Sequence, residues 1–268
     1  MFRCLECNKR FVVDHGQLTY YSHQSQDKWN DLIIDTIAGK SLLSTAAKLD
    51  VDEKTVFRMR HKFLRFLEEE QYPICIIRSN WIGWKISSNK PQRKENRRKI
   101  SKKRGQAAKK RGLSDEKICI ITGLERFGKA VAETWNVAKS TIKDCIEFGR
   151  HIEAKSYVWT DGLESYTKML NDKQCNRTVV KDHTEYDTVN HLNNVNSFHS
   201  AIEKQYEKYR GVASQYINRY NALFCMQRET KDMDYQEYLI YVLRKLKKSI
   251  HYFFVRQINK DGLFKLEF

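Results

Sequence analysis

Short runs rich in β-branched residues alternate with amphipathic runs through the middle of the chain, and their order limits the possible folds. Three of these runs, residues 74–84, 117–127 and 128–137, are interrupted by glycine, which favours consecutive antiparallel strands. A helical pattern, a strand, a second helical pattern, a further strand and a long helix follow, in residues 139–149, 156–160, 162–172, 177–180 and 195–224. This order predicts an α/β domain of the RNase H-like type, with a mixed sheet and flanking helices.

The long helix is predicted from apolar residues that repeat at steps of three or four between Val195 and Phe224. Gly211 lies within this repeat and is a candidate for a kink. Another helix is expected near residues 235–256, with one apolar face and one basic face. We therefore expect residues 229–268 to form a C-terminal helical tail.

Three helical patterns precede the sheet, in residues 28–69. The second is short and rich in alanine, and the third opens with polar and basic residues after a short turn. This is the pattern of a small all-α helix-turn-helix domain. On this interpretation four side chains of the third helix project toward the major groove of DNA: Lys54, Thr55, Arg58 and His61. An ordinary three-helix bundle is the alternative.

A Cys-x-x-Cys pair, Cys4 and Cys7, resembles one knuckle of a zinc ribbon. Tetrahedral Zn²⁺ needs four ligands, and no second pair of this kind follows, so His15 and His23 are the substitutes that the sequence offers. The two interpretations are bound Zn²⁺ and a partial ribbon in a chain that is shortened at its start. The odd number of cysteines, 7, is expected to be reduced thiols in a chain that is not exported.

Basic charge is concentrated in one segment of the chain. The 49 Lys and Arg residues exceed the 33 Asp and Glu residues, which gives a formal net charge of +16. Residues 90–112 carry much of this excess and few apolar residues, which favours an arm over a core element. The arm is expected to follow DNA phosphates in a salt-dependent way, through Arg97, Arg98, Lys102, Lys103, Arg104, Lys109, Lys110 and Arg111. A solvated linker is the alternative.

No apolar run is long enough for a membrane span, which needs about 18 residues. The first residues lack the apolar core of a signal peptide. We therefore expect a cytoplasmic protein that associates with DNA through its basic arm.

An acidic residue, Asp161, ends the fourth predicted strand and precedes a glycine. An Asp-Gly turn would explain it, and so would a metal ligand. Two-metal phosphoryl transfer takes carboxylates from separate strands, and hard oxygen ligands suit Mg²⁺ or Mn²⁺. An RNase H-like sheet carries its ligands on the first strand, at the end of the fourth and on the long helix that follows. Asp161 occupies the fourth-strand position.

Several stretches together resemble bacterial insertion-sequence transposases of the insertion sequence 1595 superfamily, in its ISXO2-like branch. They are CLECNKRF, the helix-turn-helix pattern, KKRGLSDEKICIITGLER, VWTDGLESY and HLNNVNSFHSAIEKQYEKYRGVASQYINRYNALF. The resemblance spans residues 1–228 and is most specific from His191 to Phe224. It implies a partial zinc-ribbon knuckle, a helix-turn-helix domain and an RNase H-like catalytic domain, in residues 1–25, 26–70 and 71–228.

The resemblance also implies an enzyme that cuts and joins double-stranded DNA at the terminal repeats of its own element, as a homodimer, with Mg²⁺ or Mn²⁺. The family's third metal ligand, a Glu or an Asn, follows the histidine of its motif by five residues. Here that histidine is His191 and the ligand is Asn196. Asp161, Asn196 and Lys204 are therefore the catalytic candidates. The family's lysine position itself holds Glu203, next to Lys204.

One departure from the family concerns the first metal ligand. Members carry an Asp-Glu-Thr triplet on the first strand, and it falls here on Arg78, Ser79 and Asn80. No carboxylate lies between Tyr72 and Asn89, as though the coding frame had slipped and later recovered. An arginine at the ligand position repels the cations that the site should bind. The hypothesis is a transposase-derived protein whose metal site is broken.

Three alternatives stay open. Glu133 or Glu125 could replace the lost acid in a working transposase. A DNA-binding protein without catalysis, acting as a repressor of its element or as a domesticated regulator, would need only the helix-turn-helix and the basic arm. A decaying remnant with no selected role is the third.

Overall fold

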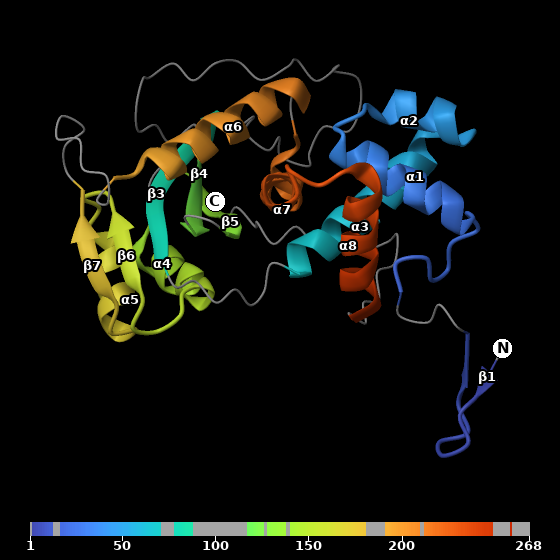
Figure 1. Cartoon of the computed structure of the whole chain (residues 1–268), viewed down its shortest axis with the longest axis horizontal. Helices are drawn as coiled ribbons and strands as arrows, with labels where there is room; N and C mark the ends of the chain where they lie inside the picture. Colours follow the sequence, from blue (N-terminus) through green and yellow to red (C-terminus); the bar gives the residue numbers. More distant parts are fainter. Residues whose placement is uncertain are drawn as a thin grey trace, which may run out of the picture. The chain divides into compact units, whose positions relative to one another are not determined.

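The chain forms two compact units in a computed structural model (Figure 1). One unit comprises Met1–Glu70 with Thr230–Asp261, and the other comprises Gln71–Glu229 with Gly262–Phe268. The structure describes residues 2–12, 17–70, 78–87, 117–125, 128–137, 140–180, 191–209, 212–248 and 258. Each unit is considered by itself.

The first unit contains a short hairpin and four helices. The hairpin pairs β1 (Phe2–Arg3) with β2 (Arg10–Phe11). The helices are α1 (Gln26–Ile37), α2 (Leu42–Leu49), α3 (Glu53–Glu70) and α8 (Tyr235–Lys248). Ser25 and Ser41 begin α1 and α2, because each hydroxyl accepts a hydrogen bond from a backbone N–H of the first turn. The three helices expected in residues 28–69 are therefore present.

The core of this unit is formed by the apolar faces of its helices. Trp29, Leu32 and Ile33 of α1 are buried, and so are Val56 and Phe63 of α3. Helix α8 contacts α1 and buries Tyr238, Val242 and Leu246, which recur every four residues. The described part of the predicted C-terminal tail therefore belongs to the same unit as the N-terminal helices.

The second unit is built on a mixed five-stranded sheet. Its strands are β3 (Arg78–Ser87), β4 (Lys117–Glu125), β5 (Ala130–Val137), β6 (Tyr157–Thr160) and β7 (Asn176–Val179). They lie in the order β5-β4-β3-β6-β7. Strands β3, β4 and β5 are antiparallel neighbours, whereas β6 and β7 run parallel to β3.

Helices α4 (Ile142–Phe148), α5 (Ser165–Asp172), α6 (Asn193–Tyr209) and α7 (Ile217–Glu229) complete this unit. Three strands, a helix, a strand, a helix, a strand and a helix follow one another, as the sequence predicts. The unit is a mixed α/β domain.

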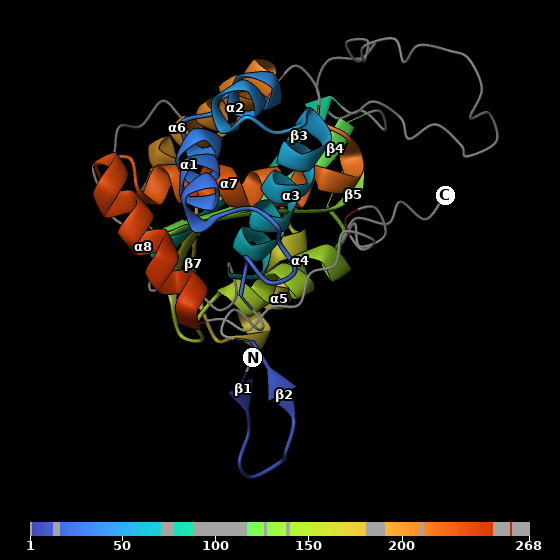
Figure 2. The ribbon, with the colours of Figure 1, turned by 90° about the vertical axis from the view of Figure 1, so that its right-hand side faces the viewer.

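The two faces of the sheet are covered by different helices (Figures 1 and 2). Ile121 and Val131 point to one face, where they form a buried cluster with Phe148 of α4 and Tyr166 of α5. Thr122, the next residue of β4, points to the opposite face, where α6 contacts β3 and β4. The side of the sheet that faces α6 is therefore distinct from the apolar core beneath α4 and α5.

Helix α7 contacts β5, which is an edge strand. The side-chain amide of Asn218 accepts a hydrogen bond from the backbone N–H of Thr134 at 2.9 Å and donates one to its carbonyl at 3.1 Å. Backbone N–H and C=O groups on the outer side of an edge strand otherwise have no strand partner, so Asn218 provides hydrogen bonds to both groups of Thr134.

The single long helix expected from Val195 to Phe224 is wrong. Helix α6 ends at Tyr209, and α7 starts at Ile217 after a short 3₁₀ turn. One straight helix could not serve both packing surfaces, because α6 lies over β3 and β4 whereas α7 lies against β5. The apolar repeat continues through the break because α7 is buried on nearly all sides, and Gly211 lies outside the described residues.

None of the helices in the described ranges is both long enough and apolar enough to span a membrane.

Candidate functional site

Asp161 lies directly after β6 and opens a tight turn. Its Oδ1 accepts a hydrogen bond from the backbone N–H of Leu163 at 3.2 Å, and the side chain is half-buried. Its Oδ2 accepts none from the part of the chain that the structure describes. Burial raises the pKa of the Asp161 carboxyl, while the Leu163 N–H and the Arg177 charge oppose that rise. The Asp-Gly turn and the metal ligand are therefore compatible interpretations of Asp161, since a carboxylate that closes a turn with one oxygen can bind a cation with the other.

The register of the sheet identifies the position of β3 that lies beside Asp161. Arg78 pairs with Tyr157, the first residue of β6, and Trp81 pairs with Thr160, the last. Continuing this register by one residue brings position 82 beside Asp161. Arg78 is four residues earlier, about 13 Å away along the strand. Position 82 is an isoleucine, and β3 contains no carboxylate at any position from 78 to 87.

A buried hydrogen bond fixes α6 over the same part of the sheet. Thr122 pairs with Ile82 in the β3–β4 register, and its Oγ1 lies 2.7 Å from Nε2 of His199. Asn196 precedes His199 by three residues, so it lies one turn earlier on a similar face of α6. Thr122 and Asp161 are two strands apart, about 10 Å. Asn196 therefore lies one helical turn from a side chain that is anchored on β4.

Asp161 and Asn196 offer one carboxylate and one amide carbonyl as candidate ligands, and no hydrogen bond joins the two side chains among the described residues. Asn196 is half-buried, and its side-chain amide makes no hydrogen bond with any described residue. A carboxylate and an amide carbonyl are suitable ligands for Mg²⁺, which commonly keeps several waters and uses few protein oxygens. A pair of cations needs more negative charge than one carboxylate supplies. In the described ranges no three His, Cys, Asp or Glu side chains gather as a metal-binding group.

Lys204, the third catalytic candidate, is exposed on α6, and so is its neighbour Glu203. Burial and the nearby Glu207 raise the pKa of the Glu203 carboxyl. The structure shows no bond from Lys204 to Asp161 or Asn196 among the described residues.

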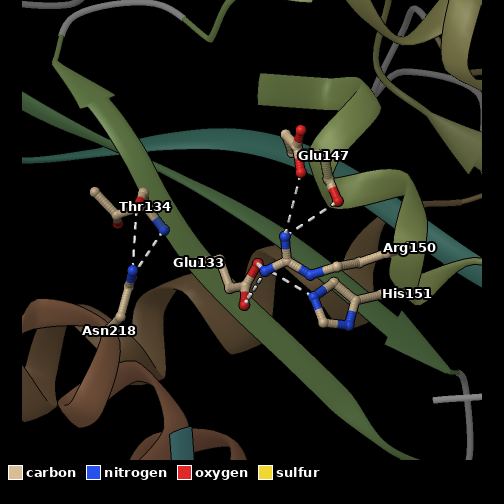
Figure 3. Close-up of polar contacts among 6 residues, drawn as sticks. All are labelled: Glu133, Thr134, Glu147, Arg150, His151 and Asn218. Atoms are coloured by element: carbon tan, nitrogen blue, oxygen red, sulfur yellow. Dashed lines mark hydrogen bonds and ion pairs between the residues drawn. The ribbon is translucent and has the colours of Figure 1, made fainter. Parts of the chain in front are cut away.

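The two acids that could replace the lost ligand lie elsewhere. Both oxygens of Glu133 accept hydrogen bonds from Arg150, at 2.7 and 2.9 Å, and His151 Nε2 lies 3.1 Å from it (Figure 3). Glu133 pairs with Ile121, so it points to the face away from α6. Glu125 pairs with Ser79, at the end of β3 remote from position 82. Neither acid faces Asp161.

The residues expected to contact DNA differ in exposure. Lys54 and Arg58 are exposed on α3, and Thr55 is half-buried. His61 is only 1% exposed, and its ring lies 4.2 Å from that of Phe57, so the expectation that it projects toward a groove is wrong. The period of α3 places position 61 on the buried stripe with the apolar residues. The arm residues Arg97, Arg98, Lys102, Lys103, Arg104, Lys109, Lys110 and Arg111 lie outside the described residues.

Cys4 and Cys7 lie in the turn of the β1–β2 hairpin. Cys4 N–H donates to the Lys9 carbonyl at 2.9 Å, and Asn8 N–H donates to the Cys4 carbonyl at 3.0 Å. Backbone N–H groups of Cys7 and Glu6 lower the pKa of the Cys4 thiol. The turn therefore favours a thiolate, as a metal-binding knuckle does. His23 is exposed, and His15 lies outside the described residues. The thiols of Cys4 and Cys7 are therefore the Zn²⁺ ligand candidates that the described hairpin brings together.

Sequence reasoning missed the residues that support this site. The Thr122–His199 bond joins residues 77 positions apart, and Arg177 of β7 binds the Asp161 turn. No local pattern pairs such residues. The sequence offered two signals: a histidine, His199, within the apolar stripe of α6, and an arginine, Arg177, within the short strand β7.

His199 is expected to make the protein less stable in acid. Burial lowers its pKa from 6.5 to about 4, so the unfolded chain takes up a proton first. Its contribution is complete above pH 6.5 and falls by about 3 kcal/mol as the pH drops to about 4. Urea unfolding of the native protein and of His199→Gln between pH 7 and 4 measures the difference. Equal acid slopes in the two proteins would contradict this assignment.

Comparison with known proteins gives one sequence match and several weak structural ones. The sequence model of the ISXO2-like transposase domain matches residues 81–225. No curated protein sequence matches the chain.

Among solved structures, the intasome of simian T-cell lymphotropic virus in complex with PP2A regulatory subunit B56 gamma shares 7% identity and a TM-score of 0.33, over 73% of this chain and 68% of that chain. The pre-cleavage Mos1 transpososome shares 8% identity and a TM-score of 0.24, over 86% of this chain and 80% of that chain. The Mos1 strand transfer complex shares 11% identity and a TM-score of 0.26, over 91% and 80%.

Proposed function

Because this chain belongs to the family of ISXO2-like transposase domains, we propose that it is a transposase-type protein that binds the ends of its own element and cuts DNA poorly. Its second unit is of the RNase H-like type on this proposal. The strand order and the succession of elements support that assignment.

A single observation carries the proposal of impaired cutting. The strand next to Asp161 has no carboxylate, either at position 78, where the family resemblance puts it, or at position 82, where the register puts it. Asp161 and Asn196 then supply one negative charge to a site that should hold two divalent ions. Since Glu133 is engaged by Arg150 and faces away, no nearby acid of the described sheet compensates.

The proposed roles of the remaining residues follow from their chemistry. Asp161 Oδ2 and the Asn196 carbonyl would hold one Mg²⁺ or Mn²⁺, and exposed Lys204 would contact a DNA phosphate. A divalent ion bound there would act as a Lewis acid toward a phosphoryl oxygen. The low effective charge of the site predicts weak metal binding.

DNA binding is proposed for the first unit and for the basic arm. Lys54 and Arg58 are exposed at the start of α3, which follows α2 after residues 50–52. This arrangement supports α3 as the helix that enters the major groove in a helix-turn-helix. Joining two element ends requires two copies, so a homodimer on double-stranded terminal repeats is the proposed assembly.

Strand cleavage tests the proposal directly. The full-length protein is incubated with DNA that carries its element ends and with Mg²⁺ or Mn²⁺, and products are resolved on a denaturing gel. We expect at most trace cleavage, because the second charge of the metal site is missing. Efficient cleavage and joining would overturn the proposal of impairment.

A second candidate is a DNA-binding protein without catalysis. The first unit favours it, because its helices and exposed cations are in place while the metal site lacks an acid. Footprinting on the terminal repeats without metal is expected to show protection that Arg58→Ala weakens. Lys168→Ala, which removes an equal charge from an exposed position of α5 in the other unit, should leave it unchanged. Equal protection of unrelated DNA would contradict a specific role.

A further inference from the structure

Arg177, on β7, binds the turn that carries Asp161 through three of its nitrogen atoms. Nε donates to Thr160 Oγ1 at 2.8 Å, and Nη1 donates to Thr167 Oγ1 at 2.7 Å. Nη2 donates to two backbone carbonyls, those of Asp161 at 3.2 Å and Leu163 at 2.9 Å. One planar group thus joins the end of β6, the turn and the first part of α5.

The geometry of these bonds restricts the turn more than a point charge would. A guanidinium presents its donors in a rigid fork, so its partners are held at fixed directions to one another. Leu163 is held at both of its backbone polar groups, since its carbonyl accepts from Arg177 and its N–H donates to Asp161 Oδ1. The orientation of the Asp161 carboxylate therefore depends on the same residue that Arg177 fixes.

We propose that Arg177 is a positioning residue: it holds the turn that carries Asp161 and so orients the Asp161 carboxylate, whose Oδ2 accepts no hydrogen bond from the described residues, as a metal ligand. Arg177 does not touch the metal in this role, because every bond that it makes within the described ranges is directed to an oxygen atom of residues 160–167. The proposal rests on the proposed function, which makes Asp161 a ligand. Partners of metal ligands typically change metal affinity by about 10- to 100-fold when they are removed.

A purely structural role is the competing explanation. Arg177 would then serve to hold β7 against α5 through Thr167, and its loss would lower the stability of the unit without a particular effect on the turn. Thr167→Val is the matched control, because it removes the bond to α5 and keeps the bonds to Thr160, Asp161 and Leu163.

The experiment compares the full-length native protein with Arg177→Lys, Thr167→Val and the milder variant Thr160→Val. Mn²⁺ binding is measured from the electron paramagnetic resonance signal of free Mn²⁺. Amide hydrogen exchange of Leu163 is measured by NMR, and the midpoint of thermal unfolding is recorded for each protein. The lysine keeps the charge and loses the fork, so it separates charge from geometry.

We expect Arg177→Lys to weaken Mn²⁺ binding about tenfold and to speed exchange of the Leu163 amide. Thr160→Val should change both in the same direction by a smaller factor, which keeps the test valid if Arg177→Lys does not fold. Thr167→Val should leave both unchanged, even where it lowers the unfolding midpoint. Unchanged Mn²⁺ affinity and exchange in both Arg177→Lys and Thr160→Val would overturn the proposal.

Asp161→Asn separates this inference from the proposed function. If Asp161→Asn leaves Mn²⁺ binding unchanged, the ligand assignment itself is wrong. If Asp161→Asn weakens binding while Arg177→Lys and Thr160→Val do not, the ligand assignment stands and only the positioning role falls.

Discussion

Replacing Ile82 with aspartate is expected to tighten Mn²⁺ binding at least about tenfold and to produce strand cleavage in a protein that is proposed to cut poorly. The register brings position 82 beside Asp161 and opposite Thr122, which is bonded to α6. A carboxylate there adds the second negative charge that a two-metal site requires. Manganese titration and a denaturing gel with element-end DNA measure the two effects.

Two further variants give this prediction its controls. Ile82→Asn matches the size of the aspartate without its charge, so it should tighten Mn²⁺ binding much less. Arg78→Asp restores the acid where the family resemblance puts it, about 13 Å from Asp161 along the strand. Recovery with Arg78→Asp and none with Ile82→Asp would show that position 78, and not position 82, is the lost ligand.

Removal of the Glu133 carboxylate is expected to destabilise the second unit by about 3 kcal/mol. Glu133 is buried on β5, and its two oxygens accept from Arg150 while His151, fully buried, lies 3.1 Å away. Glu133→Ala would leave His151 without its acid in a place that water does not reach, whereas Arg150, whose side chain is 35% exposed, can turn to solvent. Urea unfolding at pH 7 measures the change.

Glu147 provides a matched control for that experiment. Its carboxylate lies 3.8 Å from the same Arg150, but its side chain is 55% exposed, against 5% for Glu133. An exposed pair at this distance contributes at most about 0.5 kcal/mol, so Glu147→Ala should have little effect. Similar losses in the two variants would contradict the view that burial makes the Glu133 cluster important.

The order of elements could be predicted because periodicity is a local property. β-branched runs and helical stripes are visible within ten residues, and they correctly gave the five strands of the second unit, α4, α5 and the start of α6. The end of α6 could not be predicted, since the apolar repeat continues into α7. The two helices are separate because α6 packs on β3 and β4 whereas α7 packs on β5. These contacts are between residues far apart in the sequence, so no short stretch predicts them.

The candidate site was predictable in part for the same reason. Asp161 could be identified from a strand followed by Asp-Gly, and Asn196 from a family motif. The support of each proposed ligand comes from distant residues, Arg177 for Asp161 and Thr122 through His199 for Asn196. The prediction for His61 was wrong for a local reason. Its basic neighbours suggested a DNA contact, but the helical period places His61 on the buried face of α3.

The first unit is encoded in two separate stretches, and its helix α8 is the last described helix of the chain. During translation, the ribosome completes residues 71–229 before the partner of α1 exists. A product that stops early, for example after a frameshift within the sheet, lacks α8 and leaves part of α1 uncovered. On the proposed function such fragments would be poor competitors for element ends, so self-inhibition by truncated copies would require a chain that reaches at least Leu246.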